Sequence, residues 1–171
     1  MTILGDDRWW QVASRTVTAV QSALTVSVER AGVVPGAVAW DACDCGLLAV
    51  SWTAAFPSDV FPAEQTGVTG NCGSAWEVSE FLVQVVRCAP NPNGQSLAPT
   101  VADLSESARL LDTDGNQTAR AVSVLLCTMK DAMEVEDFLV TRRTPQGPEG
   151  GCVGIEQRFL VALPRLAVAT V

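Results

Sequence analysis

The chain of 171 residues contains no histidine. Cysteine and serine nucleophiles usually depend on a histidine that accepts their proton, so this absence argues against the common thiol and serine hydrolases. The G-x-S-x-G motif and the glycine-rich motifs that bind nucleotides are also missing. We therefore expect a protein that is not an enzyme, with no catalytic residue and no cofactor.

Basic residues and long apolar runs are scarce as well. The 11 lysine and arginine residues face 19 aspartate and glutamate residues, which gives a formal net charge of −8. A general attraction to DNA phosphates is therefore not expected. No apolar run reaches the roughly 18 residues of a membrane-spanning helix, and an acidic pair lies near the N-terminus, where a secretory signal would carry basic residues. We expect a soluble protein that is neither exported nor bound to a membrane.

Apolar residues are plentiful, at 48% of the chain, and the length suits one domain over residues 1–171. Apolar residues in steps of three and four predict a helix from Asp6 to Arg30. Alternating apolar residues predict a strand that ends at Phe56. A shorter strand is expected at 38–40, and residues 41–46 would form the turn between these two strands.

The second half of the chain begins with residues 76–88, whose apolar side chains on both faces predict a central strand. Thr100–Asp103 resembles a capping box and predicts the start of a long helix that ends near Ala132. The apolar seam of this helix keeps its phase through a polar segment that contains Gly115. Burial of several seam side chains, at ~1.5–3 kcal/mol each, outweighs the cost of about 1 kcal/mol for a glycine in a helix. The seam comprises Leu104, Ala108, Leu111, Gly115, Thr118, Val122, Leu125 and Met129.

Two further alternating runs, at 138–144 and 153–163, surround a Gly/Pro-rich loop at 145–151. They predict a C-terminal β-hairpin. Strands grouped between helices, without regular βα alternation, are typical of an α+β fold. We expect a mainly antiparallel sheet that is packed by the N-terminal helix and by the long central helix.

The six cysteines raise the question of a metal site. Cys43 and Cys45 are one residue apart, and Cys72 and Cys152 have glycine neighbours, so these four are weak candidates for metal ligands. A structural zinc site usually has two C-x₂₋₄-C pairs or histidine ligands, and the chain has neither. We therefore expect no metal and favour plain thiols over disulfides and over metal ligands.

Acidic pairs in the central helix are a second possible site. Asp112 and Asp114 with Gly115 faintly match a calcium-binding loop, but the glutamate that closes such a loop is missing. Side chains two positions apart on a helix also point to different sides. We expect these carboxylates to form a solvated face.

Contacts with partners are expected at three places. Trp9 and Trp10 are neighbours in the first predicted helix, so one should pack inward and the other should face a partner or the solvent. The predicted loops Pro57–Ser74 and Pro145–Gly151 are longer than simple connections require. The expected interface residues are Trp9, Trp10, Phe56, Pro57, Val60, Phe61, Pro145, Gln146, Pro148 and Glu149.

The element order, the size and the acidic charge accompany two stretches of distinctive sequence. These are Val38–Trp52 followed by Phe56–Ser58, and Val85–Pro90 followed by Pro99–Asp103. Together they resemble the tail terminator proteins of long-tailed (siphovirus) actinobacteriophages. The resemblance implies a structural virion protein that forms a homo-hexameric ring, caps the tail tube, ends its polymerisation and docks it to the head connector.

The resemblance also implies where the protein acts and with what. Its partners would be further copies of itself, the major tail tube protein and the head-completion (stopper) protein, and DNA would pass through the lumen without specific binding. The protein would be made in the host cytoplasm and located in the virion at the head–tail junction. Two alternatives stay open: another head–tail connector, such as a stopper or adaptor, and a small cysteine-based metal-binding module.

Overall fold

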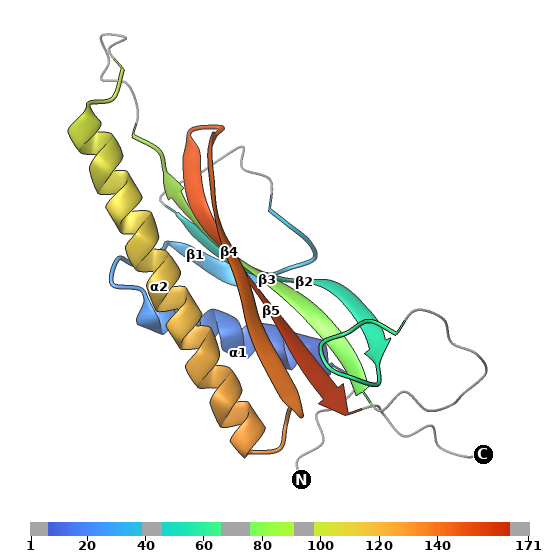
Figure 1. Ribbon diagram of the computed structural model, residues 1–171. Helices are drawn as coiled ribbons and strands as arrows, with labels where there is room; N and C mark the ends of the chain where they lie inside the picture. The colour runs from blue at the N-terminus through green and yellow to red at the C-terminus, as the bar shows by residue number, and fades with distance from the viewer. Residues whose placement is uncertain (1–6, 39–45, 66–75, 91–97, 165–171) are drawn as a thin grey trace, which may run out of the picture.

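The computed structural model describes residues 7–38, 46–65, 76–90 and 98–164 (Figure 1). The five strands of this part form one open sheet in the order β1-β2-β3-β5-β4, with β3 in the middle. β1 runs parallel to β2, and the other neighbouring strands are antiparallel. The expected α+β fold with a mainly antiparallel sheet is thus confirmed. In chain order, the elements are α1 (Arg8–Ala23), β1 (Arg30–Val34), β2 (Leu47–Ser58), β3 (Trp76–Cys88), α2 (Val101–Asp131), β4 (Asp137–Glu149) and β5 (Cys152–Pro164).

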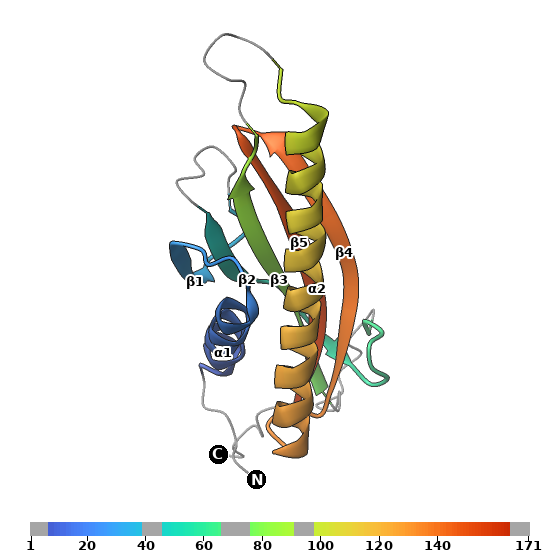
Figure 2. The same ribbon diagram turned by 90° about the vertical axis from the view of Figure 1, so that its left-hand side faces the viewer.

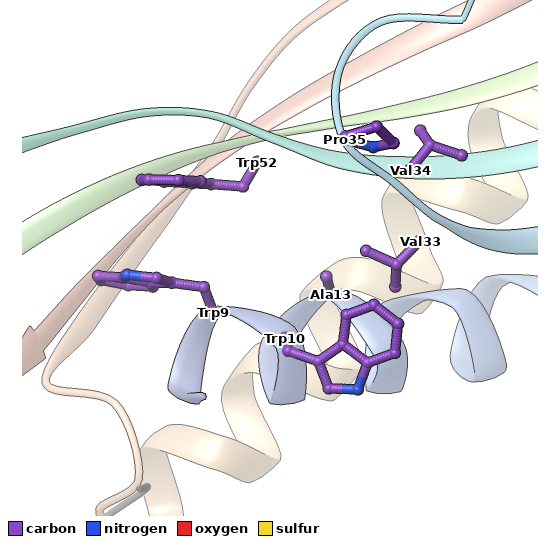
Figure 3. A pocket seen from close by; sticks show the side chains of 7 residues that line it. All are labelled: Trp9, Trp10, Ala13, Val33, Val34, Pro35 and Trp52. Atoms are coloured by element: carbon purple, nitrogen blue, oxygen red, sulfur yellow. The ribbon is translucent and has the colours of Figure 1, made fainter. Parts of the chain in front are cut away.

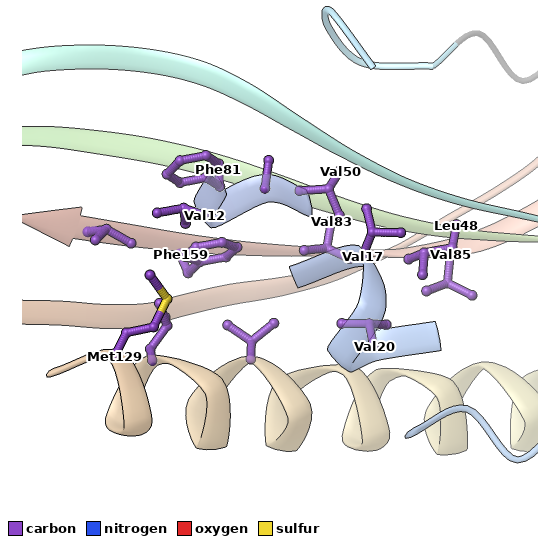
Figure 4. Packing of buried hydrophobic residues seen from close by; sticks show 14 of the residues in the cluster. Val12, Val17, Val20, Leu48, Val50, Phe81, Val83, Val85, Met129 and Phe159 are labelled. Carbon is purple, nitrogen blue, oxygen red and sulfur yellow. The ribbon is translucent and has the colours of Figure 1, made fainter. Parts of the chain in front are cut away.

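Both helices cover the same face of the sheet (Figures 1 and 2). α1 contacts β1 and β2, α2 contacts β4 and β5, and the two helices contact each other. One core lies between the layers, where the rings of Phe81 and Phe159 stack with their centroids 5.0 Å apart (Figure 4). Val12 of α1 and Met129 of α2 belong to the same fully buried core. None of the helices in the described part of the chain is long and apolar enough to span a membrane.

α1 ends earlier than the sequence pattern predicts. The helix stops at Ala23, because Leu24 takes an extended conformation (φ −68°, ψ 122°). Leu24 and Val28 are nevertheless buried, since the segment after the helix lies against the core. The first strand is therefore β1, and the strand expected at 38–40 is not found at Val38, which lies outside any strand. Residues 39–45, which include Cys43 and Cys45, lie outside the described residues.

α2 has nearly the predicted bounds. The capping box is present: the backbone N–H of Asp103 donates to Oγ1 of Thr100 at 3.2 Å, and that of Thr100 donates to Oδ2 of Asp103 at 3.1 Å. The second half of the predicted seam is buried, with Leu126 more deeply buried than Leu125. The first half is not, because no residue of α2 before Asp114 is buried.

The loop predicted at Pro145–Gly151 is wrong for most of its length. β4 continues to Glu149, and only Gly150 and Gly151 separate it from β5. β4 is an edge strand, so a proline there removes no hydrogen bond that the sheet needs. The ladder also shifts between Gln146 and Glu149. Gly147 lies in this irregular stretch with φ +94°, and a Cβ atom there would lie 2.6 Å from the carbonyl oxygen of Cys152.

β2 likewise runs further than predicted. The strand includes Pro57 and Ser58, which pair with Glu77 and Trp76 of β3. A register shift between Trp52 and Ala54 reverses which face the following residues occupy. The loop predicted at Pro57–Ser74 therefore begins two residues later, and residues 66–75, which include Cys72, are outside the described part.

Candidate interaction surface

The two adjacent tryptophans of α1 have different surroundings. The ring of Trp9 stacks on that of Trp52 in β2, with centroids 6.2 Å apart and planes 8° apart. The guanidinium carbon of Arg8 lies 4.7 Å from the centroid of the Trp9 ring. Trp10 points away and is 58% exposed. The prediction that one tryptophan packs inward is confirmed, and the other lies on the surface in the single chain.

Trp10 borders an apolar groove between α1 and the strands β1 and β2 (Figure 3). We call it the tryptophan groove; its volume is about 360 Å³. None of its lining side chains is charged, so it offers no acid, base or nucleophile. It can hold apolar side chains, and buried aromatic residues are the residue type that most often dominates the energy of protein interfaces. Its lining residues are Trp9, Trp10, Ala13, Val33, Val34, Pro35 and Trp52.

A second apolar surface lies on the first turns of α2. Val101 is 79% exposed and Leu104 is 51% exposed. Ala108 is also exposed, whereas Leu111 is half-buried. We call these four residues the α2 ridge. They follow steps of three, four and three, so they lie along one side of the helix and continue the line of the buried seam.

The polar segment in the middle of α2 holds the helix to the rest of the protein. Asp114 is completely buried, and its two carboxylate oxygens accept hydrogen bonds from Nε (2.8 Å) and Nη2 (3.1 Å) of Arg87 in β3. Arg87 also donates to the backbone carbonyls of Val26 (2.6 Å) and Ser27 (2.8 Å). The expectation of a solvated carboxylate is therefore wrong for Asp114, whereas Asp112 is exposed as predicted.

The residues after Asp114 complete this polar cluster. Nη1 of Arg143 in β4 donates to Oδ1 of Asn116 at 2.7 Å. The backbone N–H of Thr25 donates to Oε1 of Gln117 at 3.0 Å, and Nε2 of Gln117 donates to Oγ1 of Thr25. A Cβ atom on Gly115 would lie 2.8 Å from Cδ of Arg143. The side chains of Asp114, Asn116 and Gln117 thus bind other parts of the chain, and the interpretation of this segment as a calcium-binding loop has no support.

The remaining predicted interface residues lie at the two ends of the sheet. Phe56 and Pro57 are half-buried near the end of β2, while Val60, in the following turn, is 72% exposed and Phe61 is half-buried. The other group is Pro145, Gln146, Pro148 and Glu149 at the end of β4. Glu149 pairs with Cys152, and Cys152 pairs with the last residue of β3. Ser58, at the end of β2, pairs with the first residue of β3. The structure therefore does not bring the two groups together.

Only one of the four candidate metal ligands lies in the described residues. Cys152 is buried and disulfide-bonded, so its sulfur is not a thiolate ligand. This corrects the preference for a plain thiol at that position. Within the described ranges, no group of three or more histidine, cysteine, aspartate or glutamate residues could hold a metal ion.

The sequence pattern missed the tryptophan groove and the Arg87–Asp114 pair. Trp52 was part of a recognised alternating strand, but nothing local showed that it would stack on Trp9. The ion pair left a weak signal: Arg87 follows a long apolar run in β3, and Asp114 precedes the seam residue Gly115. A charge in each of these positions could have indicated a buried partner.

No model of a protein family matches the sequence, and a search of curated proteins finds no similar chain.

Proposed function

We propose that this chain is a structural subunit of a long-tailed bacteriophage, the tail terminator. In this role it forms a hexameric ring at the head–tail junction, caps the tail tube and ends its polymerisation. One side of the ring binds the last ring of major tail tube protein, and the other binds the head-completion protein. DNA passes through the lumen, and the acidic chain, with net charge −8, gives the phosphates no general attraction.

The observation that carries this proposal is the arrangement of the elements. The elements follow the order helix, three strands, helix, two strands, and the resemblance of the sequence to tail terminators includes this order. The strands form an open sheet with two helices. A stopper would favour a closed β-rich barrel, and an adaptor would favour a mainly helical fold. The open sheet therefore supports the terminator over these two connectors.

The position of the predicted contact segments also supports the proposal. The turn after β2 and the end of β4 lie beyond opposite ends of β3, which has 13 residues. At about 3.3 Å per residue, roughly 40 Å separates them. A subunit in a ring between tail and head needs two separate surfaces along the axis, and segments at opposite ends of one sheet satisfy that need.

Electron microscopy of the purified protein tests the proposal. We expect rings in negative stain, either alone or after mixing with tail tube protein. Tube protein that polymerises in the presence of this chain should give shorter tubes, with a ring at one end. An acidic protein of similar size is the control for nonspecific effects. If tube length is unchanged and no ring forms under either condition, the protein is not a terminator.

A further inference from the structure

We propose that the tryptophan groove of one copy binds the α2 ridge of a second copy, so that copies join head to tail. This inference rests on the proposed function in one respect only, which is that successive contacts between copies close into a ring. The contact itself is a prediction about two surfaces of one protein, and it can be tested without any phage component.

The ridge has the pattern of a helix that is packed against a partner. Its four residues have the same phase as Thr118, Val122 and Met129, which are buried further along α2. The single chain covers the second half of this seam and leaves the first half exposed. Isolated exposed apolar residues need no explanation, but a continuous line at steps of three and four is the pattern by which helices dock into grooves.

The groove has the matching character. Its lining is apolar, and Trp10 and Trp52 are 58% and 46% exposed in the single chain. Its volume of about 360 Å³ is near the lower end of the 300–1,000 Å³ that is usual for binding pockets. A cavity of this size suits a few aliphatic side chains, such as those of Val101 and Leu104, better than a large ligand.

Both surfaces can be buried without leaving a charge unpaired, which would be costly. On the ridge side, Asp103 is held in the capping box, and Glu106 accepts two hydrogen bonds from Arg109. This interaction lowers the pKa of the Glu106 carboxyl. On the groove side, Arg8 is paired with Glu77 at 3.1 Å. Complementary apolar surfaces with compensated charges therefore occur on one chain.

The ridge cannot reach the groove of its own chain. α2 is fixed to β3 through Asp114 and Arg87, and its first turns lie well away from α1 in both views of the molecule (Figures 1 and 2). A ridge that fills the groove must therefore come from another copy. Because the groove and the ridge are different patches, their contact is heterologous, and such contacts produce closed rings or open filaments.

The test uses two variants of the full chain, each of which damages one surface. Leu104→Glu places a charge on the ridge, and Trp10→Glu places one at the groove. Ala102→Glu, on another side of the same turn of α2, and Gln21→Glu, at an exposed position of α1 away from the groove lining, are the matched controls. Thermal unfolding and circular dichroism verify that all four variants are folded.

Sedimentation velocity over a range of concentrations then gives the oligomeric state. We expect the wild type and both controls to self-associate, and we expect each surface variant to weaken association by about tenfold or more, as loss of an interface anchor does. A mixture of the two surface variants should form a 1:1 dimer and nothing larger. In that dimer, the intact ridge of Trp10→Glu binds the intact groove of Leu104→Glu, and both remaining surfaces are damaged.

Three results would overturn the inference. The first is a wild-type chain that stays monomeric up to its solubility limit. The second is association that Trp10→Glu abolishes and Leu104→Glu leaves unchanged, since the groove would then bind something else, such as a second groove. The third is failure of the mixture to dimerise while each variant remains folded.

The outcome is separable from that of the proposed function. A 1:1 dimer from the mixture, with open filaments and no effect on tail tubes in the wild type, would support the contact and contradict the terminator role. Rings that form normally from Leu104→Glu would support the role and contradict the contact.

Discussion

Arg87 lies at the end of β3, and its guanidinium group binds three residues in two parts of the chain. It contacts the α1–β1 connection through the carbonyls of Val26 and Ser27, and it contacts α2 through Asp114. Its side chain is 7% exposed and that of Asp114 is 1% exposed. At this burial, the pair is screened little by solvent, and each charge depends on the other.

We expect Asp114→Asn to destabilise the protein by about 3 kcal/mol, because it leaves the buried charge of Arg87 without an anion. Asp112→Asn is the matched control on the same helix; its side chain is 72% exposed and lies 4.0 Å from Arg143, so its effect should stay within about 0.5 kcal/mol. Urea unfolding of the two variants measures both effects. Equal stability of the two variants would show that the buried pair is not important for the fold.

A second residue-scale prediction concerns Gly147. Its φ of +94° disfavours a side chain, and a Cβ atom would meet the Cys152 carbonyl oxygen at 2.6 Å. Because the clash is with backbone, Gly147→Ala should destabilise the protein by about 1–3 kcal/mol. Gly32→Ala in β1 is the control, since no atom lies within 4 Å of its added Cβ. A lower melting temperature for Gly147→Ala alone is expected, and equal melting temperatures for both variants would contradict this account of the β4 turn.

At the scale of elements, α2 is divided into two halves with different roles. From Asp114 onward, its seam is buried against the sheet and α1, whereas no residue of the helix before Asp114 is buried. The capping box at Thr100 satisfies backbone groups at the free end, which supports a helix start without tertiary packing. The last turn is held by Lys130, which donates to Asp137 at the start of β4 at 2.7 Å.

This division predicts unequal effects of the same substitution along one helix. Leu126→Ala should cost about 2–5 kcal/mol of folding free energy, because it opens a cavity in the core. Leu104→Ala should cost less than about 0.5 kcal/mol in the monomer, because that side chain is already 51% exposed. Denaturant unfolding at concentrations too low for association measures both. A large loss for Leu104→Ala under these conditions would mean that the ridge is packed within the single chain.

At the scale of the whole molecule, the described residues form one sheet, two helices and one core, and among them no group of three or more cysteine, aspartate or glutamate side chains could hold a metal ion. Cys43, Cys45 and Cys72 lie outside that part, so a direct measurement must address them. The sequence offers no histidine and no C-x₂₋₄-C pair to build a zinc site.

We expect elemental analysis of the purified protein to find no stoichiometric zinc, and a chelator to leave the melting temperature unchanged. A sample dialysed without chelator is the control. A structural zinc site contributes directly to folding free energy, so its removal would lower the melting temperature strongly. One equivalent of zinc, or unfolding on chelation, would favour a metal-binding module over the terminator.

The sequence by itself determined the types of all the elements except β1, and many of their bounds. β3 was predicted with its observed bounds and central position, and α2 was predicted to within one residue, since both depend on local patterns. Alternation marks a strand because successive side chains point to opposite faces, and Thr100 and Asp103 form a capping box across three residues. These signals need no information about distant parts of the chain.

Only the tertiary structure decided which residues meet. Arg87 and Asp114 are 27 positions apart, and Trp9 and Trp52, whose rings stack, are further apart still in the sequence. β4 pairs with β5 at Pro145 and again at Glu149, beyond Pro148, because a strand at the edge of the sheet tolerates proline. Local propensity does not show that edge position. Propensity and periodicity act over a few residues, whereas the pairing of a charge, the position of a strand in its sheet and the shape of a groove depend on contacts between segments far apart in the chain.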